Sequence, residues 1–285
     1  MSLLVRALGL IPLPLLYIWG WLAFAITFYL LRWRREQVEH DVALSLAGRS
    51  SAERARIVRD SYLHGADTVI EMLWGFGASG RAILRRVVFE NPEVVLRLAD
   101  EKKTVVLLTP HFCNWEWLFL AGGARFGFAI ETVYQPHRIA WIDRFLVAAR
   151  SRFGGRPIAR KEFVFELMNA SPGAHVYSLI ADQTPKRHER KHWTTFLGRD
   201  TAFYTGADQV TRFLDATVLY VAMRRVSRGH YTVKVEILAE PPFDTGGREV
   251  IMEKFARRAE QAILEHPEDF LWLQKRWKYP RPADE

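Results

Sequence analysis

The fold is decided by the stretch from Thr104 to Glu116, which reads T-V-V-L-L-T-P-H-F-C-N-W-E. Its first five residues, ending at Leu108, form an apolar run typical of a buried strand in a parallel sheet. A helix is expected to begin near Trp115, so His111 lies between the end of a strand and the start of a helix. In open α/β folds, ligands bind at this carboxyl edge of the sheet.

His111 and Glu116 are the pair best placed for chemistry. A histidine can take a proton from an attacking hydroxyl group, and a carboxylate can hold the imidazole in the required tautomer. We therefore predict that His111 is a general base and that Glu116 orients it. The alternative for His111 is a structural role at the start of the helix. Cys113 is expected to be a packed turn residue rather than a nucleophile.

Strands and helices alternate from residue 104 onward, which predicts an α/β fold with a mixed, mostly parallel sheet flanked by helices. The predicted strands are 104–108, 130–134, 156–159, 175–181, and a final antiparallel pair at 217–225 and 231–238. The predicted helices are 114–126, 139–153, 163–169, 206–214 and 249–265. Residues 36–100 are expected to be mainly helical, with Glu71 as a buried helix glutamate satisfied by partners or, alternatively, as a site residue.

Two further loops are expected at the same edge of the sheet, Tyr134–Pro136 and Asp182–Pro185. Right-handed crossovers bring such loops together at one end of a parallel sheet. A phosphate or a developing oxyanion would need a cation there, and Arg160 lies just beyond the short strand 156–159. Asp182 is expected either to ligate a metal or to hold its loop through backbone hydrogen bonds.

The N-terminal segment carries no charged side chain from Ala7 to Leu31, a run of 25 residues. At about 1.5 Å per residue this run is long enough to cross a hydrocarbon layer of roughly 30 Å. A cleavable signal peptide is disfavoured, because no small-x-small site precedes the basic cluster at 32–35. That cluster outweighs Arg6, so the body of the protein is predicted to be cytoplasmic. We expect a retained anchor at 1–35, spanning or embedded, and one domain at 36–285.

Composition narrows the classes of partner and reaction. A net charge of +8 favours an acidic partner, which could be phosphate, an anionic lipid, a nucleic acid or an acidic carrier protein. The single cysteine excludes an internal disulfide framework. The sequence has no Gly-x-Ser-x-Gly elbow, no histidine pair with zinc-helix spacing, and no Walker or dinucleotide glycine pattern. These absences disfavour a serine hydrolase, a zinc-helix site and a nucleotide-binding fold.

Several motifs together resemble a known family. His111 and Glu116 match the His-x4-Asp/Glu signature of the lysophospholipid acyltransferase superfamily, and Asn114-Trp115-Glu116 is typical of its lipid A branch. Similar blocks follow in family order at 182–185, 195–198, 266–268 and 272–278. With the N-terminal anchor, they extend over essentially the whole chain. The sequence thus resembles the late lauroyl/myristoyl-type acyltransferases of lipid A biosynthesis.

The resemblance implies that a hydroxyl group of a lipid A precursor attacks the thioester of an acyl carrier protein. His111, held by Glu116, would deprotonate this hydroxyl, and the activated thioester would need no metal, cofactor or covalent enzyme intermediate. The residues implied to bind substrate are Arg160, Asn114, Asp182 and Gln183. The implied location is the inner membrane, with the catalytic domain on the cytoplasmic side and no nucleic acid partner.

Some positions depart from the family pattern and leave alternatives open. Gln135 stands where many lipid A enzymes have an arginine, and Cys113 replaces a common glycine. The acceptor could therefore be another lipid, such as a mannosylated phosphoinositide or an amino-acid lipid, and coenzyme A could be the donor. A lipid hydrolase, or a basic membrane-surface or nucleic-acid-binding protein without catalysis, are the alternatives from other classes.

Overall fold

The computed structural model describes residues 3–170, 173–243 and 250–282, with the side chains of residues 3 and 4 excepted. Its centre is a seven-stranded sheet in the order β1-β9-β8-β2-β5-β3-β4, accompanied by a two-stranded sheet, β6-β7. The strands are β1 Val87–Phe89, β2 Val105–Thr109, β3 Ile130–Tyr134, β4 Gly155–Ala159, β5 Val176–Ile180, β6 Lys191–Phe196, β7 Arg199–Tyr204, β8 Thr217–Ser227 and β9 His230–Ala239. The predicted α/β class with a mixed, mostly parallel sheet is confirmed.

Strand β2 lies in the middle of the sheet, parallel to β5 on one side and to β8 on the other. All five of its residues are buried, as expected for an apolar strand covered on both faces. Strands β3 and β4 continue the parallel arrangement beyond β5, and β8 and β9 form the predicted antiparallel pair. The loops that follow β2, β5 and β3 therefore meet at one edge of the sheet.

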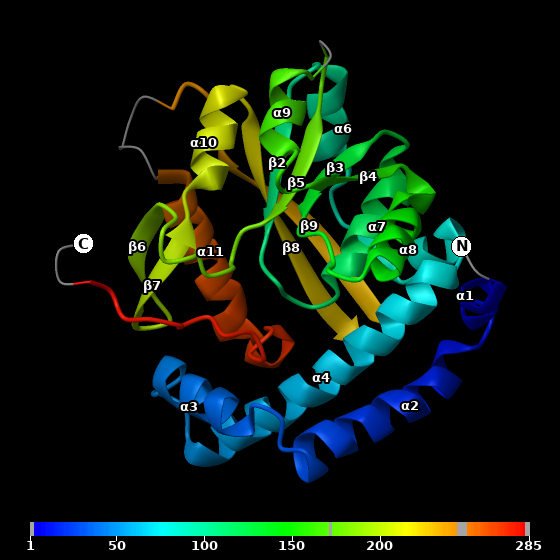
Figure 1. The fold of residues 1–285 in the computed structure, drawn as a ribbon, viewed down its shortest axis with the longest axis vertical. Coiled ribbons are helices and arrows are strands. Elements are labelled where there is room, and N and C mark those ends of the chain that lie inside the picture. The colour runs from blue at the N-terminus through cyan, green and yellow to red at the C-terminus, as the bar shows by residue number, and fades with distance from the viewer. Residues whose placement is uncertain (1–2, 171–172, 244–249, 283–285) are drawn as a thin grey trace.

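Helices cover both faces of the sheet. They are α6 Glu93–Asp100, α7 Trp115–Phe126, α8 Ala140–Arg150, α9 Phe163–Met168, α10 Gly206–Phe213 and α11 Val250–Glu265. Tyr220 and Val221 of β8 point to opposite faces, as successive strand residues do. The ring of Tyr220 lies 5.9 Å from that of Phe255 in α11, whereas Val221 lines a pocket with Phe119 of α7. Figure 1 shows α11 and α7 on the two sides of the sheet.

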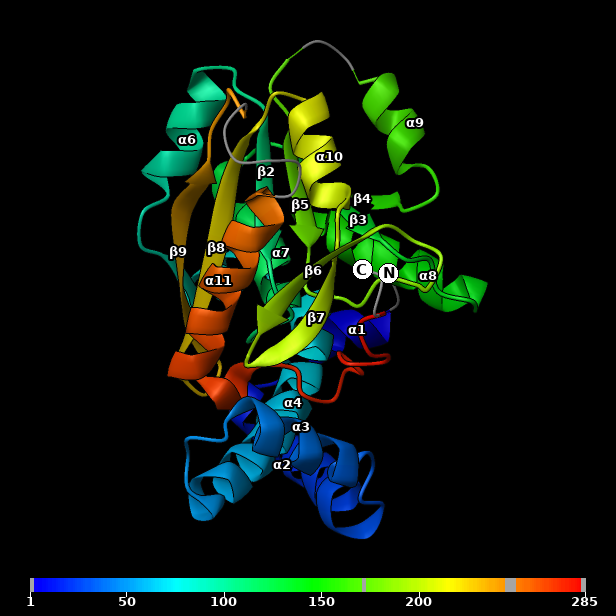
Figure 2. The same ribbon diagram turned by 90° about the vertical axis from the view of Figure 1, so that its left-hand side faces the viewer.

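The N-terminal third forms a helical layer at one end of the sheet. It consists of α1 Leu3–Leu8, α2 Leu13–Ala25, a π-helical turn Ile26–Leu30, α3 Arg35–Ser45, α4 Ser51–Gly77 and α5 Gly80–Leu84. Helix α2 runs alongside α4, below the sheet in Figures 1 and 2. Among the described residues, one helical segment, Leu13–Leu30, is long and apolar enough to cross a membrane, and 33% of it is buried against the protein. The predicted anchor is thus an apolar helix docked along one side.

Glu71 of α4 fastens this layer to the sheet and to the loop after β2. Its carboxylate accepts hydrogen bonds from Tyr17 of α2 at 2.7 Å, Asn114 at 2.9 Å and Tyr231 of β9 at 2.6 Å. The side chain is fully buried, and burial raises its pKa. Glu71 is therefore the partner-satisfied helix glutamate that the sequence favoured over a site residue.

Two parts of the fold were not predicted. Strand β1 lies within residues 36–100 and has only three residues, too few to show a period of two. The β6–β7 hairpin follows a basic stretch, and its strand β6 includes Lys191 and His192, which gave no apolar alternation. Its turn uses Leu197 and Gly198, both at positive φ.

Candidate active site

The loop after β2 holds His111 at the edge of the sheet. Its backbone is tied to the C-terminal segment, because the amide of Leu271 donates to the His111 carbonyl at 3.2 Å and Phe112 forms an isolated bridge with Phe270. Cys113 has a φ of 52°, in the left-handed region that favours glycine. The imidazole is therefore presented by a tight turn that the C-terminal segment holds in place.

Asp182 is the hydrogen-bond partner of the His111 imidazole. Its Oδ1 lies 2.7 Å from His111 Nδ1, and its Oδ2 accepts a hydrogen bond from Gln274 at 3.0 Å. Both residues are buried, Asp182 completely. Burial alone would lower the pKa of His111, but the charge of Asp182, its hydrogen bond and the charge of Glu116 together outweigh burial and raise this pKa. Burial would raise the pKa of Asp182, but the charge and hydrogen bond of His111, the hydrogen bond from Gln274 and the charge of Arg276 together lower this pKa.

Glu116 is not the hydrogen-bond partner of His111, so the predicted pairing needs correction. Both carboxylate oxygens of Glu116 accept hydrogen bonds from the guanidinium of Arg150, at the end of α8, and one of these contacts measures 3.0 Å. The physical reason is geometric: Glu116 lies in the first turn of α7 and faces α8, whereas Asp182 extends from β5, the direct neighbour of β2. The Glu116 charge still favours the protonated imidazole from a distance.

Asn114 and Arg160 also lie elsewhere than the sequence suggested. Asn114 is fully buried and caps α7, where its side chain accepts a hydrogen bond from the Trp117 amide at 2.9 Å while donating to Glu71. These two hydrogen bonds fix the His111 loop, and the buried Asn114 side chain is not accessible to a substrate.

Arg160 is paired with Glu189 at 2.5 Å, over the ring of Tyr204, and its side chain is 42% exposed. It does not line the cleft at His111.

A polar cleft opens at the free side of the imidazole. It has a volume of about 220 Å³, and its lining includes His111, Tyr134, Gln135, Arg150 and Gln183. The Gln183 amide nitrogen lies 3.4 Å from His111 Nε2. The predicted meeting of the three loops at one sheet edge is therefore observed, because residues of all three loops line this cleft.

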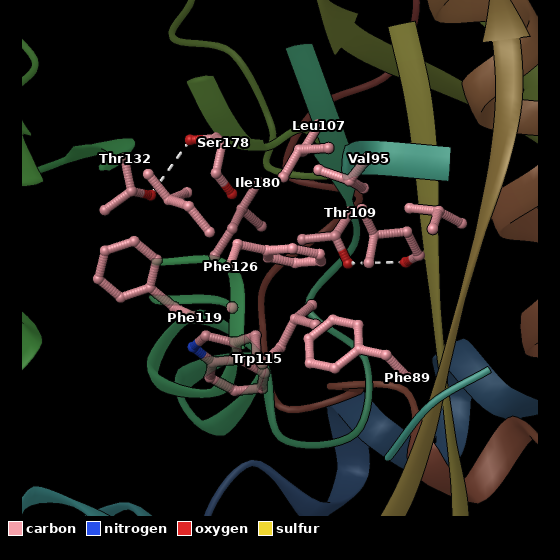
Figure 3. A pocket seen from close by; sticks show the side chains of 15 residues that line it. Phe89, Val95, Leu107, Thr109, Trp115, Phe119, Phe126, Thr132, Ser178 and Ile180 are labelled. Atoms are coloured by element: carbon pink, nitrogen blue, oxygen red, sulfur yellow. Dashed lines mark hydrogen bonds between the residues drawn. The ribbon is translucent and has the colours of Figure 1, made fainter. Parts of the chain in front are cut away.

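An apolar pocket lies next to this cleft, between the sheet and α7 (Figure 3). Its walls come from both layers and include Leu107, Trp115, Phe119, Phe126 and Ile180. The free volume is about 50 Å³, so a long chain could enter only if side chains that line the pocket moved. Trp115 and Phe119 line both this pocket and the polar cleft.

The site has neither a metal cluster nor a reactive thiol among the described residues. Within 3–170, 173–243 and 250–282, no three His, Cys, Asp or Glu side chains are grouped so that they could hold a metal ion. Burial raises the pKa of Cys113 well above its usual value, so the thiol stays protonated.

Comparison with known proteins identifies the family. A model described as bacterial lipid A biosynthesis acyltransferase matches residues 3–279, which is nearly the whole chain. The chain belongs to this family. A lipid A biosynthesis acyltransferase of Haemophilus influenzae is 21% identical over 213 residues, covering 72% of this chain and 64% of that protein. The chain thus matches slightly less than two thirds of the length of this curated relative.

A solved structure is also similar. The crystal structure of the 1-acyl-sn-glycerophosphate (LPA) acyltransferase PlsC from Thermotoga maritima aligns with a TM-score of 0.41 and 13% identity. The alignment covers 87% of this chain and 96% of that one.

In this member of the lipid A acyltransferase family, three residues at the candidate site were not predicted from the sequence. Arg150 ends the helix α8, and nothing in its neighbourhood in the sequence distinguishes it from a solvated helix arginine. Trp115 belongs to the Asn-Trp-Glu motif, which assigns it no role of its own, and Gln274 lies inside the C-terminal block that resembles the family. The order of that block was the one signal that could have linked Gln274 to the loop of Asp182.

Proposed function

We propose that this protein is a membrane-associated acyltransferase that moves a fatty acyl chain from the thioester of an acyl carrier protein to a hydroxyl group of a lipid A precursor. The observation that carries the proposal is the buried His111–Asp182 pair, whose Nε2 side opens to a polar cleft beside an apolar pocket. A base, a polar place for a hydroxyl group and an apolar place for a chain are what acyl transfer to a lipid requires.

In the proposed reaction, Asp182 accepts the Nδ1 hydrogen of His111, which leaves the Nε2 lone pair directed away from Asp182. His111 takes the proton of the acceptor hydroxyl as its oxygen attacks the thioester carbonyl carbon. The carbon–sulfur bond then breaks, and the sulfur of the donor leaves with the proton that His111 had taken. Glu116 and Arg150 line the cleft as an ion pair, so their opposite charges largely cancel and the pair fixes the wall of the cleft.

The charge distribution supports the proposed partners. The net charge of +8 suits both an acidic carrier protein and a phosphorylated glycolipid. Arg160 is held by an exposed ion pair with Glu189, and exposed pairs contribute little free energy, so a phosphate group could replace the glutamate. We propose Arg160 as a phosphate contact at the surface rather than as a group within the cleft.

The N-terminal layer supports attachment to a membrane. Large apolar side chains of α2 and the turn that follows it are exposed in the described structure: Leu15, Ile18, Trp19, Trp21, Leu22, Ile26 and Tyr29. The basic residues at 32–35 follow directly, a pattern typical of a segment that meets an anionic membrane surface. The proposed site is the inner membrane, with the catalytic domain on its cytoplasmic side.

A second acceptor class is favoured by one observation. Gln135 lines the polar cleft and carries no charge, although many lipid A enzymes have an arginine there. An acceptor with fewer phosphate groups than a lipid A precursor would suit this cleft.

The test is an assay with purified protein, acyl carrier protein loaded with a fatty acyl chain, and candidate acceptors in mixed micelles. We expect an acylated lipid and free carrier thiol in equal amounts, and both should disappear in His111→Ala. Free fatty acid released without any acceptor would instead identify a hydrolase. Membrane or nucleic acid binding that His111→Ala leaves unchanged, with no turnover by the wild type, would identify a protein without catalysis.

A further inference from the structure

A second, larger cavity lies on the other side of the His111 loop, between α4 and the C-terminal segment. We call it the α4 cavity. Its volume is about 450 Å³, within the range of roughly 300–1,000 Å³ that is usual for ligand pockets. Its walls are mainly apolar and include Gly65, Val69 and Met72 of α4 and Phe270 and Leu273 of the C-terminal segment.

Gly65 keeps this cavity open. A glycine inside a helix destabilises it relative to alanine, so its presence usually has a packing or functional reason. At Gly75 of the same helix the reason is packing, because an added Cβ would lie 2.4 Å from Trp117 Nε1. At Gly65 an added Cβ would meet only Leu273 Cδ1, at 3.7 Å, an ordinary contact. Packing therefore does not require glycine at position 65, and the missing side chain leaves free space.

The α4 cavity adjoins the apolar surface that we propose to face the membrane. Val69 lines it and is 56% exposed, and Leu73, one turn further along α4, is 45% exposed. Trp33 and Arg34, which follow the apolar helix, also line it and are exposed. A hydrocarbon chain could therefore pass from the bilayer into the cavity along apolar side chains.

The same cavity reaches the catalytic loop. Trp115 lines both the α4 cavity and the polar cleft, and its ring lies 5.1 Å from the His111 imidazole in an edge-to-face arrangement. The cavity also has polar positions, among them His64, whose Nδ1 lies 2.8 Å from Asp269 Oδ1. A ligand that fits has an apolar chain and a polar group near Trp115.

We propose that the α4 cavity binds a hydrocarbon chain of the membrane-embedded acceptor lipid and so presents its hydroxyl group to His111 around Trp115. This inference rests on the proposed acyl transfer and adds the place of the acceptor. The acceptor is favoured over the donor because the cavity opens beside the membrane-facing helices. A chain delivered by a water-soluble carrier would instead enter the apolar pocket between the sheet and α7.

Two substitutions at Gly65 form a matched pair for the test. Gly65→Leu fills the cavity, whereas Gly65→Ala adds one methyl group that the site accommodates, and both residues favour a helix. The binding probe is a lysophosphatidic acid with a diazirine in its acyl chain, added to vesicles of phosphatidylethanolamine and phosphatidylglycerol. After irradiation, peptide mass spectrometry locates the cross-links. The control for folding is the melting temperature, which both variants should keep at or above that of the wild type.

We expect cross-links within residues 61–72 and 268–274 in wild type and in Gly65→Ala, and their loss in Gly65→Leu. With a long-chain acceptor, Gly65→Leu should raise KM by about 10-fold or more, the size of effect typical of an altered apolar pocket. Cross-links confined to other segments, or a Gly65→Leu enzyme with unchanged KM, would overturn the inference. A His111→Ala protein that still cross-links in the α4 cavity, combined with a wild type that transfers no acyl chain, would contradict the proposed function alone.

Discussion

Replacing Asp182 with asparagine removes the charge that holds His111, while the side chain keeps its shape. Asparagine can still meet Nδ1 with its oxygen, but the buried imidazolium that forms during catalysis loses its counter-charge. General base catalysis contributes about 10²–10⁴-fold to a rate. At about 1.36 kcal/mol per tenfold change, this is roughly 2.7–5.4 kcal/mol of barrier. We expect Asp182→Asn to lower kcat/KM by that factor, measured as thiol released from the acyl carrier protein.

The pH dependence separates this effect from simple unfolding. Because the Asp182 charge raises the pKa of His111, its removal should move the acid limb of the kcat/KM profile to lower pH while the plateau falls. Glu116→Gln is the control: it leaves Arg150 as an unpaired and mostly buried cation, so its main effect should be a lower melting temperature. A folded Glu116→Gln protein without turnover, beside a fully active Asp182→Asn protein, would refute this reasoning and restore Glu116 as the orienting residue.

Further predictions concern pH, packing and membrane attachment. The pKa of His111 is raised from 6.5, so kcat/KM of the wild type should rise with pH through a value above 6.5, which a pH–rate profile measures. The raised pKa also stabilises the fold. This stabilisation is fully present below pH 6.5 and is lost as pH rises through the folded-state pKa of His111, so the free energy of unfolding should fall over that range. Gly75→Ala should cost about 1–3 kcal/mol because its methyl group overlaps Trp117, whereas Gly65→Ala should add about 0.5–1 kcal/mol; urea unfolding compares the two. Ile18→Lys places a charge on the exposed face of α2 and should weaken vesicle binding in a flotation assay without changing the melting temperature; unchanged flotation would show that this face does not meet the lipid.

Local pattern was sufficient for most of the sheet and its crossover helices. The apolar run at 104–108 and the alternation of strands with helices after it are clear in the sequence. The bounds of β2, β3, β5, α7 and α10 therefore lie within a residue or two of the predicted ones. The position of His111 followed from the same pattern, because it lies directly after a buried strand. The mixed parallel sheet could therefore be predicted from sequence.

The partner of His111 could not be predicted in this way. Glu116 is close in sequence, but a residue in the first turn of a helix points where the helix axis directs it, here toward Arg150. Asp182 lies 71 positions away and meets His111 only because β5 pairs directly with β2. The order of strands was not part of the sequence pattern. The burial of Asn114 beneath Glu71 had the same origin, a tertiary contact between α4 and the His111 loop.

The most direct test of acyl transfer by His111 is the mass of the lipid product formed by purified wild type and by His111→Ala, assayed at equal concentration with equal melting temperatures. We expect the acceptor mass to increase by one acyl chain with the wild type and to stay unchanged with His111→Ala. An acylated product formed at the same rate by a folded His111→Ala protein would contradict the central role of this histidine.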